Sequence, residues 1–177
     1  MGASPGDARA GDARFMELAL ELAARAIGQG QTPFGAVLVD PAGQVIGRGH
    51  NTVRADLDPT AHAEIVAIRD GWRGVGEWPK LSGCTLYTSC EPCLLCAFVI
   101  TQIGIRRVVY AARGADVPGY RPLLGMDCAG AAAWVNRQPD WPPLEVVGDF
   151  MRERALATIA AFPWAKAQTR APVKETA

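Results

Sequence analysis

Two short stretches, about thirty residues apart, constrain the fold of this chain more than any other feature. Residues 60–64 read TAHAE, and residues 89–96 read SCEPCLLC. Each stretch is predicted to open a helix that follows an irregular or β segment. If the imidazole of one stretch acts together with the thiols of the other, the fold must bring two helix starts to one place.

His62, Cys93 and Cys96 make up the ligand set of a catalytic zinc site. Such sites use three protein ligands and keep a fourth position for water. Cys93 and Cys96 are three residues apart, so on a helix they share a face and can reach one ion. A helix N-terminus stabilises thiolates through its unpaired N–H groups and its dipole, and Pro92 suits a helix start.

Glu64 is the candidate catalytic residue. It lies two residues after His62, beside the metal but not required as a ligand. A carboxylate in this place can take a proton from water activated by zinc and pass it to a leaving amine. This pattern predicts a reaction in which water activated by zinc is the nucleophile.

A closed zinc site with four ligands is the strongest structural alternative. With Cys90 as the fourth ligand, the ion would only stabilise the fold, and the chain would be a binding or interaction module. Cys90 precedes Pro92 and belongs to the end of a strand, so its side chain need not point at the ion. A redox pair is a further alternative, but it leaves the histidine and the glutamate without a role. Cys84 and Cys128 are interpreted as buried structural residues.

Apolar periodicity and turn residues predict a single α/β domain, and 177 residues are enough for one core. The expected layout is an α/β sandwich in which helices cover a mixed sheet. Helices are predicted over residues 13–28, 61–72, a segment after Pro92, and 150–162. Strands are predicted over residues 34–40, 44–50, 81–89, 106–112 and, as a short fifth strand, 144–147.

The expected domain spans residues 13–164. Residues 1–12 are predicted to be a disordered lead, and residues 165–177 a flexible tail. Residues 113–143 contain many prolines and glycines and two tryptophans, and they are predicted to form a long specificity loop.

Composition argues against two classes of partner. Eighteen basic side chains balance eighteen acidic ones, whereas chains that grip long nucleic acids usually carry a basic excess. No segment reaches the roughly 18 apolar residues of a membrane span, and the N-terminus lacks the apolar core of a secretory signal. We therefore expect no membrane partner and a cytoplasmic location.

The chain resembles the cytidine deaminase-like superfamily over about residues 13–162. The His-x-Glu and Pro-Cys-x-x-Cys pair is the signature of the zinc nucleobase deaminases. Within that superfamily, residues 32–37, 58–64 and 87–93 look most like bacterial guanine deaminases. The resemblance implies a three-layer α/β/α fold with a five-stranded sheet and zinc at two helix N-termini. It also implies release of ammonia from a small nucleobase or nucleoside, with guanine as the leading substrate and water as co-substrate.

The resemblance also implies residues that contact the substrate. Asn51 matches an asparagine that hydrogen-bonds the base, Phe34 would lie near the ring, and the backbone around Ala63 would contact the base edge. Asp116 falls where guanine deaminases carry an acidic residue near the substrate. Residues 117–122 depart from the pattern of those enzymes, so the segment that would select the substrate is the least similar one.

Each of these assignments has a structural alternative. Asn51 could cap a strand end, Phe34 could belong to the core, and Asp116 could be a solvated carboxylate in a loop. His50, the other histidine, is interpreted as structural.

Other functions fit the same motifs. Cytosine or another aminated heterocycle such as a triazine could be the substrate, as could adenosine in transfer RNA. The zero net charge and the mixed charges of the last helix argue against an RNA surface. A structural zinc-binding module is the alternative that is not an enzyme. Relatives of this kind are usually dimers, and the apolar residues of the last helix (Phe150, Ile159, Phe162 and Trp164) predict a homodimer surface.

Overall fold

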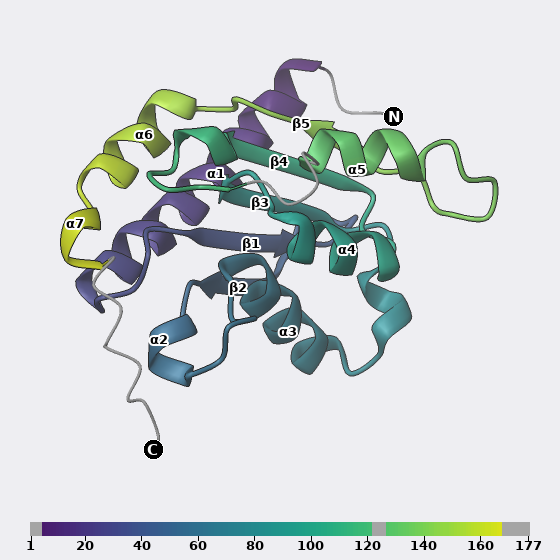
Figure 1. Cartoon of the computed structure of the whole chain (residues 1–177). Coiled ribbons are helices and arrows are strands. Elements are labelled where there is room, and N and C mark those ends of the chain that lie inside the picture. The colour runs from purple at the N-terminus through teal and green to yellow at the C-terminus, as the bar shows by residue number, and fades with distance from the viewer. Residues whose placement is uncertain (1–4, 122–126, 168–177) are drawn as a thin grey trace.

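The computed structural model describes residues 5–121 and 127–167, which form a five-stranded mixed sheet with helices on both faces (Figure 1). The strand order is β2-β1-β3-β4-β5. β1 pairs antiparallel with β2 and with β3, whereas β3, β4 and β5 run parallel. The strands are β1 (Gly35–Val39), β2 (Val45–His50), β3 (Thr85–Cys90), β4 (Arg107–Ala112) and β5 (Glu145–Val147).

The helices divide between the two faces of the sheet (Figure 1). One face is covered by α1 (Pro5–Gly28) and α6 (Arg152–Ala160). The other is covered by α3 (Ala63–Val75), α4 (Leu94–Gln102) and α5 (Cys128–Val135). The shorter elements are α2 (Val53–Asp56), α7 (Trp164–Ala167) and the 3-10 turns η1 (Trp78–Leu81) and η2 (Gly114–Asp116).

The strands supply apolar side chains to both layers. In β4, Val108 and Tyr110 pack in the cluster beneath α3, α4 and α5, whereas Val109 and Ala111 pack beneath α1 and α6. Successive side chains of a strand point to opposite faces, so a strand buried on both sides is apolar throughout. The predicted three-layer α/β/α sandwich with a five-stranded mixed sheet is confirmed.

Two glycines of β2 allow α3 to lie directly against the sheet. A Cβ atom at Gly49 would overlap the carbonyl oxygen of Ala63 and the amide nitrogen of Ala67. A Cβ atom at Gly47 would overlap the carbonyl oxygen of Ala67. Because only glycine leaves room for such a close approach, these positions fix the start of α3 beside the end of β2.

Four strand ends meet at one edge of the sheet. The register pairs Gly35 with His50 and Cys90 with Ala112. The end of β2, the start of β1 and the ends of β3 and β4 therefore lie side by side, and α3 and α4 begin close to them. In open α/β sheets, ligands bind outside the carboxyl ends of the strands.

The structure corrects the predicted disordered lead over residues 1–12, because α1 already begins at Pro5. Asp12 is buried and accepts hydrogen bonds from both terminal nitrogens of Arg107 (2.7 and 2.8 Å) and from the hydroxyl of Tyr87 (2.6 Å). These contacts hold the first half of α1 on the sheet. Residues 1–4 lie outside the described residues.

The C-terminal predictions also need correction. Residues 113–143 contain η2 and α5 in addition to irregular chain, with residues 122–126 outside the description. The helix forms over an alanine-rich run that begins after the capping side chain of Asp127. The predicted tail starts too early, since α7 continues to Ala167; residues 168–177 lie outside the described residues.

The homodimer prediction required the apolar residues of the predicted helix 150–162 and of Trp164 to face outward. In the structure they face the sheet instead. Ile159 and Phe162 are buried, and Phe150 and Trp164 pack partly buried against the cluster beneath α1 and α6. This apolar surface therefore covers the chain's own sheet. Among the described helices, none combines the length and apolar character needed to cross a membrane.

Candidate metal centre and adjoining cavity

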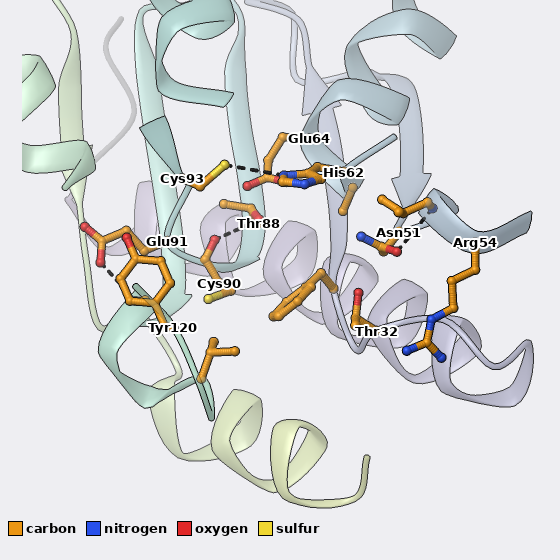
Figure 2. Close-up of a pocket in the computed structure, with 15 residues that line it drawn as sticks. Thr32, Asn51, Arg54, His62, Glu64, Thr88, Cys90, Glu91, Cys93 and Tyr120 are labelled. Atoms are coloured by element: carbon orange, nitrogen blue, oxygen red, sulfur yellow. Dashed lines mark hydrogen bonds between the residues drawn. The ribbon is translucent and has the colours of Figure 1, made fainter. Parts of the chain in front are cut away.

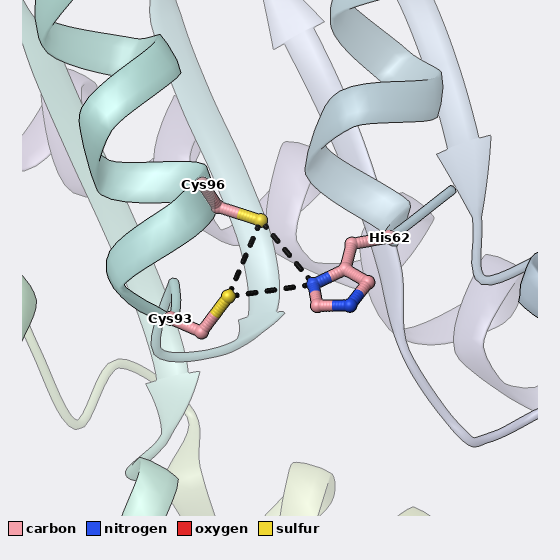
Figure 3. A group of neighbouring side chains, drawn as sticks. All are labelled: His62, Cys93 and Cys96. Atoms are coloured by element: carbon pink, nitrogen blue, oxygen red, sulfur yellow. Dashed lines mark hydrogen bonds between the residues drawn. The ribbon is translucent and has the colours of Figure 1, made fainter. Parts of the chain in front are cut away.

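His62, Cys93 and Cys96 converge between the starts of α3 and α4 (Figure 3). His62 is the N-cap residue of α3, and Cys93 is the N-cap residue of α4. Each sulfur lies near Nδ1 of the imidazole, at 3.4 Å for Cys93 and 3.5 Å for Cys96, and the two sulfurs are 3.7 Å apart. In the part of the chain that the structure describes, this is the one such group that could hold a metal ion.

The three distances fit a tetrahedral zinc ion. With Zn–S bonds of about 2.3 Å and a Zn–N bond of about 2.0 Å, tetrahedral angles place the sulfurs about 3.8 Å apart and each sulfur about 3.5 Å from the nitrogen. The observed separations of 3.7, 3.4 and 3.5 Å agree with this geometry. Three protein ligands leave the fourth position open to water or substrate.

The pKa values of the three ligands are shifted in different directions. The hydrogen bond between the two sulfurs lowers the pKa of the Cys93 thiol to about 4, against the opposing effect of burial. The hydrogen bond with Cys93 raises the pKa of His62, and the same sulfur pair together with burial raises the pKa of Cys96. The lowered pKa of Cys93 favours the thiolate form that binds a metal, and binding of a divalent cation releases the protons that the ligands still carry.

Glu64 lies in the first turn of α3 and is only 6% exposed. Its carboxyl group lies beside His62 and Cys93 (Figure 2). Burial raises the pKa of this carboxyl to about 7, and a cation at the neighbouring ligands acts in the opposite direction by favouring the carboxylate. The position suits a group that takes up and returns a proton.

Cys90 stands apart from the metal ligands. Its thiol donates a hydrogen bond to the carbonyl oxygen of Arg113 at 3.7 Å, and burial raises its pKa well above the ordinary range. The group of candidate ligands includes neither Cys90 nor its neighbours Ser89 and Glu91. This geometry does not favour the closed site with four ligands. Cys84 and Cys128 are buried and unpaired with any other cysteine, as predicted.

A cavity of about 320 Å³ opens onto the metal ligands (Figure 2). Three residues predicted from the resemblance line it, namely Phe34, Asn51 and Ala63. The lining also contains His62, Cys93 and Glu64, so the candidate proton carrier and two of the three ligands face the same space.

Asn51 is held in a fixed orientation at the cavity wall. Its backbone N–H donates to the carbonyl oxygen of Phe34 (3.0 Å), and its side-chain oxygen accepts from the backbone N–H of Val53 (3.3 Å). Figure 2 shows the amide nitrogen on the other side of the group, away from that bond. The buried side chain can therefore offer an N–H donor to a ligand.

Phe34 is positioned by the strands around it. The backbone N–H of Gly35 donates to the hydroxyl of Ser89 at 3.0 Å, which ties the start of β1 to β3. The ring of Phe34 lies 6.4 Å from that of Trp164, measured between centroids. The residue thus contributes both to the cavity lining and to packing against the C-terminal segment.

Asp116 has other partners than a substrate. Its two side-chain oxygens accept from Nη2 (2.5 Å) and Nε (2.9 Å) of Arg152, and one of them also accepts from the backbone N–H of Arg113 (2.8 Å). Asp116 is not among the residues that line the cavity. Its role in substrate binding stays a prediction. His50 likewise lies outside the lining and bonds Gln29 at 2.8 Å.

Further residues of the lining were not predicted from the sequence. Glu91 stands inside the second motif, next to Pro92, but no role had been assigned to its side chain. Tyr120 lies in the segment that departs from the guanine deaminase pattern. Thr32, Arg54 and Thr88 complete the polar part of the lining and carried no signal of their own in the sequence.

Comparison with known protein families gives one match. Residues 9–112 match the family model described as the cytidine and deoxycytidylate deaminase zinc-binding region. The matched part contains all three ligands and Glu64. Together with the donor geometry, this match confirms the prediction of a zinc cofactor.

Similar curated proteins carry two different names. A tRNA-specific adenosine deaminase of Haemophilus influenzae is 46% identical over 101 residues, which cover 57% of this chain and 58% of the relative. A tRNA-specific adenosine deaminase of Agrobacterium fabrum is 38% identical over 146 residues, or 80% of this chain and 95% of the relative. Guanine deaminase of Bacillus subtilis is 43% identical over 103 residues, or 58% and 65%. The chain thus spans less than two thirds of the Haemophilus and Bacillus relatives.

Two solved structures that resemble this chain belong to the same two kinds of enzyme, tRNA adenosine deaminases and guanine deaminases. A tRNA:A34 deaminase studied for A-to-I editing at the wobble position superposes with a TM-score of 0.68 at 33% identity, over 82% of this chain and 99% of the other. Guanine deaminase from Nitrosomonas europaea superposes with a TM-score of 0.71 at 26% identity, over 90% of this chain and 85% of the other. The fold is shared with both kinds of protein.

Proposed function

This chain belongs to the family defined by the cytidine and deoxycytidylate deaminase zinc-binding region, and from that premise we propose that it is a zinc-dependent hydrolytic deaminase. It releases ammonia from an aminated nucleobase or nucleoside, with guanine as the leading substrate. The observation that carries this proposal is the arrangement of Glu64 beside three zinc ligands, at a cavity lined by Glu64 itself and by two of the ligands, His62 and Cys93.

The chemistry divides between the metal and the protein. A zinc ion held by the three ligands supplies a Lewis acid that makes water a usable nucleophile near neutral pH. Glu64 accepts a proton as water adds to the ring carbon that bears the amino group. It then delivers a proton to the amino nitrogen, the C–N bond breaks, and ammonia leaves while the ring keeps the oxygen. The burial of Glu64 favours this exchange because it keeps bulk water away from the carboxyl group.

The size and the lining of the cavity suit a small planar substrate. Its volume of about 320 Å³ is at the lower end of the range of small-molecule sites, which suits a single base. The amide of Asn51 offers a hydrogen bond to the base, and Phe34 offers an aromatic face. Residues 113–143 contribute Gly114, Val117 and Tyr120 to the lining, which supports their proposed role in substrate selection.

Deamination of adenosine in transfer RNA is the second candidate function. The relative in Agrobacterium, which this chain covers over 95% of its length, favours it. Arg54, an exposed residue of α2 at the cavity, could contact a phosphate of a larger substrate. The zero net charge of the chain favours the free base instead, since an RNA surface normally requires a basic excess.

A screen for ammonia release separates these substrates. The zinc-loaded protein would be offered guanine, guanosine, adenine, cytosine, cytidine, an aminated triazine and a transfer RNA transcript with adenosine at the wobble position. We expect the highest kcat/KM with guanine. Release from the transcript alone would establish the second candidate. No ammonia from any of them, with zinc bound, would contradict the proposed function.

Two further proposals concern the assembly of the protein and its location in the cell. We propose that the protein works as a homodimer in the cytoplasm, acting on a small-molecule substrate. Because the apolar side of α6 is used within the chain, a dimer surface must lie elsewhere than predicted.

A further inference from the structure

Glu91 joins the start of the metal-binding helix to the irregular segment beyond β4. Its two side-chain oxygens accept hydrogen bonds from the backbone N–H groups of Gly114 (3.0 Å) and Cys128 (3.2 Å). Its own backbone N–H donates to the carbonyl oxygen of Ala112 (2.8 Å). Gly114 and Cys128 lie on either side of residues 115–127. One carboxylate therefore joins Gly114 at the cavity to Cys128 at the start of α5.

Tyr120 follows Gly114 by six residues and forms part of the cavity wall (Figure 2). Its ring covers Gly114 so closely that a Cβ atom there would lie 2.7 Å from Cζ and 2.8 Å from Cε1 of the ring. The backbone N–H of Tyr120 donates to Val117 and that of Val117 donates to Gly114, each at 3.0 Å. The place of the ring thus follows from the place of Gly114.

The two bonds of Glu91 require a carboxylate. An ionised carboxylate is an acceptor only, and it can receive an N–H group on each oxygen. Hydrogen bonds to an ionised acceptor are about twice as strong as those between neutral groups. A glutamine of the same shape offers one oxygen and one NH₂ group, so one of the two backbone N–H groups would face a donor and lose its partner.

We propose that Glu91 is a positioning residue that holds Gly114 at the cavity and fixes the start of α5 beside it, and that Tyr120, packed on Gly114, thereby becomes the aromatic wall on which the substrate base lies. The part that concerns the substrate rests on the proposed function. An aromatic face stacks favourably with a planar base and tolerates different bases. Because both oxygens of Glu91 are used by backbone groups, the role differs from the proton transfer assigned to Glu64.

The first test measures the segment without any substrate. Amide hydrogen exchange would be followed by mass spectrometry in the zinc-loaded native protein and in Glu91→Gln. We expect exchange at Gly114 or Cys128 to become about tenfold faster or more, because one hydrogen bond to a charged group is lost. Glu21→Gln is the matched control: it removes one negative charge from an exposed position of α1 and leaves this exchange unchanged.

The second test measures the substrate wall. With guanine as the probe, Glu91→Gln and Tyr120→Ala are each expected to raise KM about tenfold while kcat changes less than threefold, the loss expected for one stacked base. Tyr120→Phe keeps the ring and restores the native KM. Zinc content, measured in parallel, stays at one ion per chain in all variants.

The outcomes separate the inference from the proposed function. Native exchange in Glu91→Gln would overturn the positioning role, and so would loss of zinc from this variant, since Glu91 would then act through the metal helix. An unchanged KM in Tyr120→Ala would overturn the role of Tyr120 as the aromatic wall for the substrate. If the native protein releases ammonia from no substrate, the proposed function fails, whereas the exchange experiment still decides the role of Glu91.

Discussion

The two sides of the cavity are built in different ways. On the metal side, His62, Glu64 and Cys93 stand at the starts of α3 and α4, and close backbone contact with β2 fixes α3 on the sheet. On the opposite side, the wall is irregular chain held by a few polar bonds from Glu91 and Asp116. We therefore expect the reaction to depend on rigid elements, and substrate selection to depend on a part of the chain that can change without disturbing the metal ligands.

Replacement of a metal ligand should have the largest effect of the changes that distinguish the two sides, and it should act on zinc affinity. Cys96→Ser removes a thiolate from the metal side. Because changes beyond the direct ligands already cost about 10–100-fold in metal affinity, we expect a loss of at least about 100-fold, measured by competition with a zinc chelator. Cys90→Ser is the matched control on the same strand-to-helix connection, and it should keep native zinc affinity. Loss of zinc from Cys90→Ser would restore the closed site with four ligands.

A pair of glycine substitutions should distinguish the two sides by stability. In Gly49→Ala the new Cβ atom meets backbone of α3, which cannot move without shifting the helix. We expect the free energy of unfolding in urea to fall by about 3 kcal/mol.

Gly114→Ala applies the same change to the wall, where the three atoms nearest to the Cβ atom belong to the side chain of Tyr120. A side chain can turn aside, so the free energy of unfolding should fall by about 1 kcal/mol or less, while KM for guanine rises. An equal loss of stability in both variants would mean that the wall is as rigid as the metal side.

The ion pair between Asp116 and Arg152, which joins the wall to α6, should contribute least to stability. The hydrogen bonds from Arg152 lower the pKa of the Asp116 carboxyl, against the effect of burial. A carboxyl with a lowered pKa in the folded state stabilises the protein above its unfolded pKa of about 3.9 and loses this contribution as the pH falls through the folded value. Since Arg152 is partly exposed, Asp116→Asn should cost about 0.5–1 kcal/mol at pH 7.

The pH dependence provides the check on that ion pair. The difference in free energy of unfolding between the native protein and Asp116→Asn should close as the pH is lowered below about 4. Any loss of zinc in acid affects both proteins and cancels in the difference. A difference that stays constant from pH 7 to pH 3 would show that the ion pair with Arg152 is not its source.

The metal side could be predicted from the sequence because its signals are local. His62, Cys93 and Cys96 carry their chemistry in their side chains, and Pro92 marks the helix start that presents two of them. Short apolar runs likewise predict strands of the sheet. A strand that is buried on both faces, such as β4, is apolar along most of its length.

The wall could not be predicted because its contacts join distant residues. Glu91 bonds Gly114 and Cys128 at separations of 23 and 37 residues, and no periodicity records such bonds. The resemblance placed Asp116 near the substrate, but the pairing with Arg152, 36 residues away, could not be foreseen. In α1, the buried bonds of Asp12 extend the helix beyond the apolar pattern that defined its predicted start.

The central claim is that Glu64 transfers protons beside a zinc ion held by His62, Cys93 and Cys96. Its most direct test is ammonia release from guanine measured together with zinc content in the native protein and in Glu64→Gln. We predict one zinc ion per chain in both proteins, and a fall of about 10²–10⁴-fold in kcat for Glu64→Gln, the usual contribution of general acid–base catalysis. Retention of native kcat by Glu64→Gln with zinc bound would contradict the account.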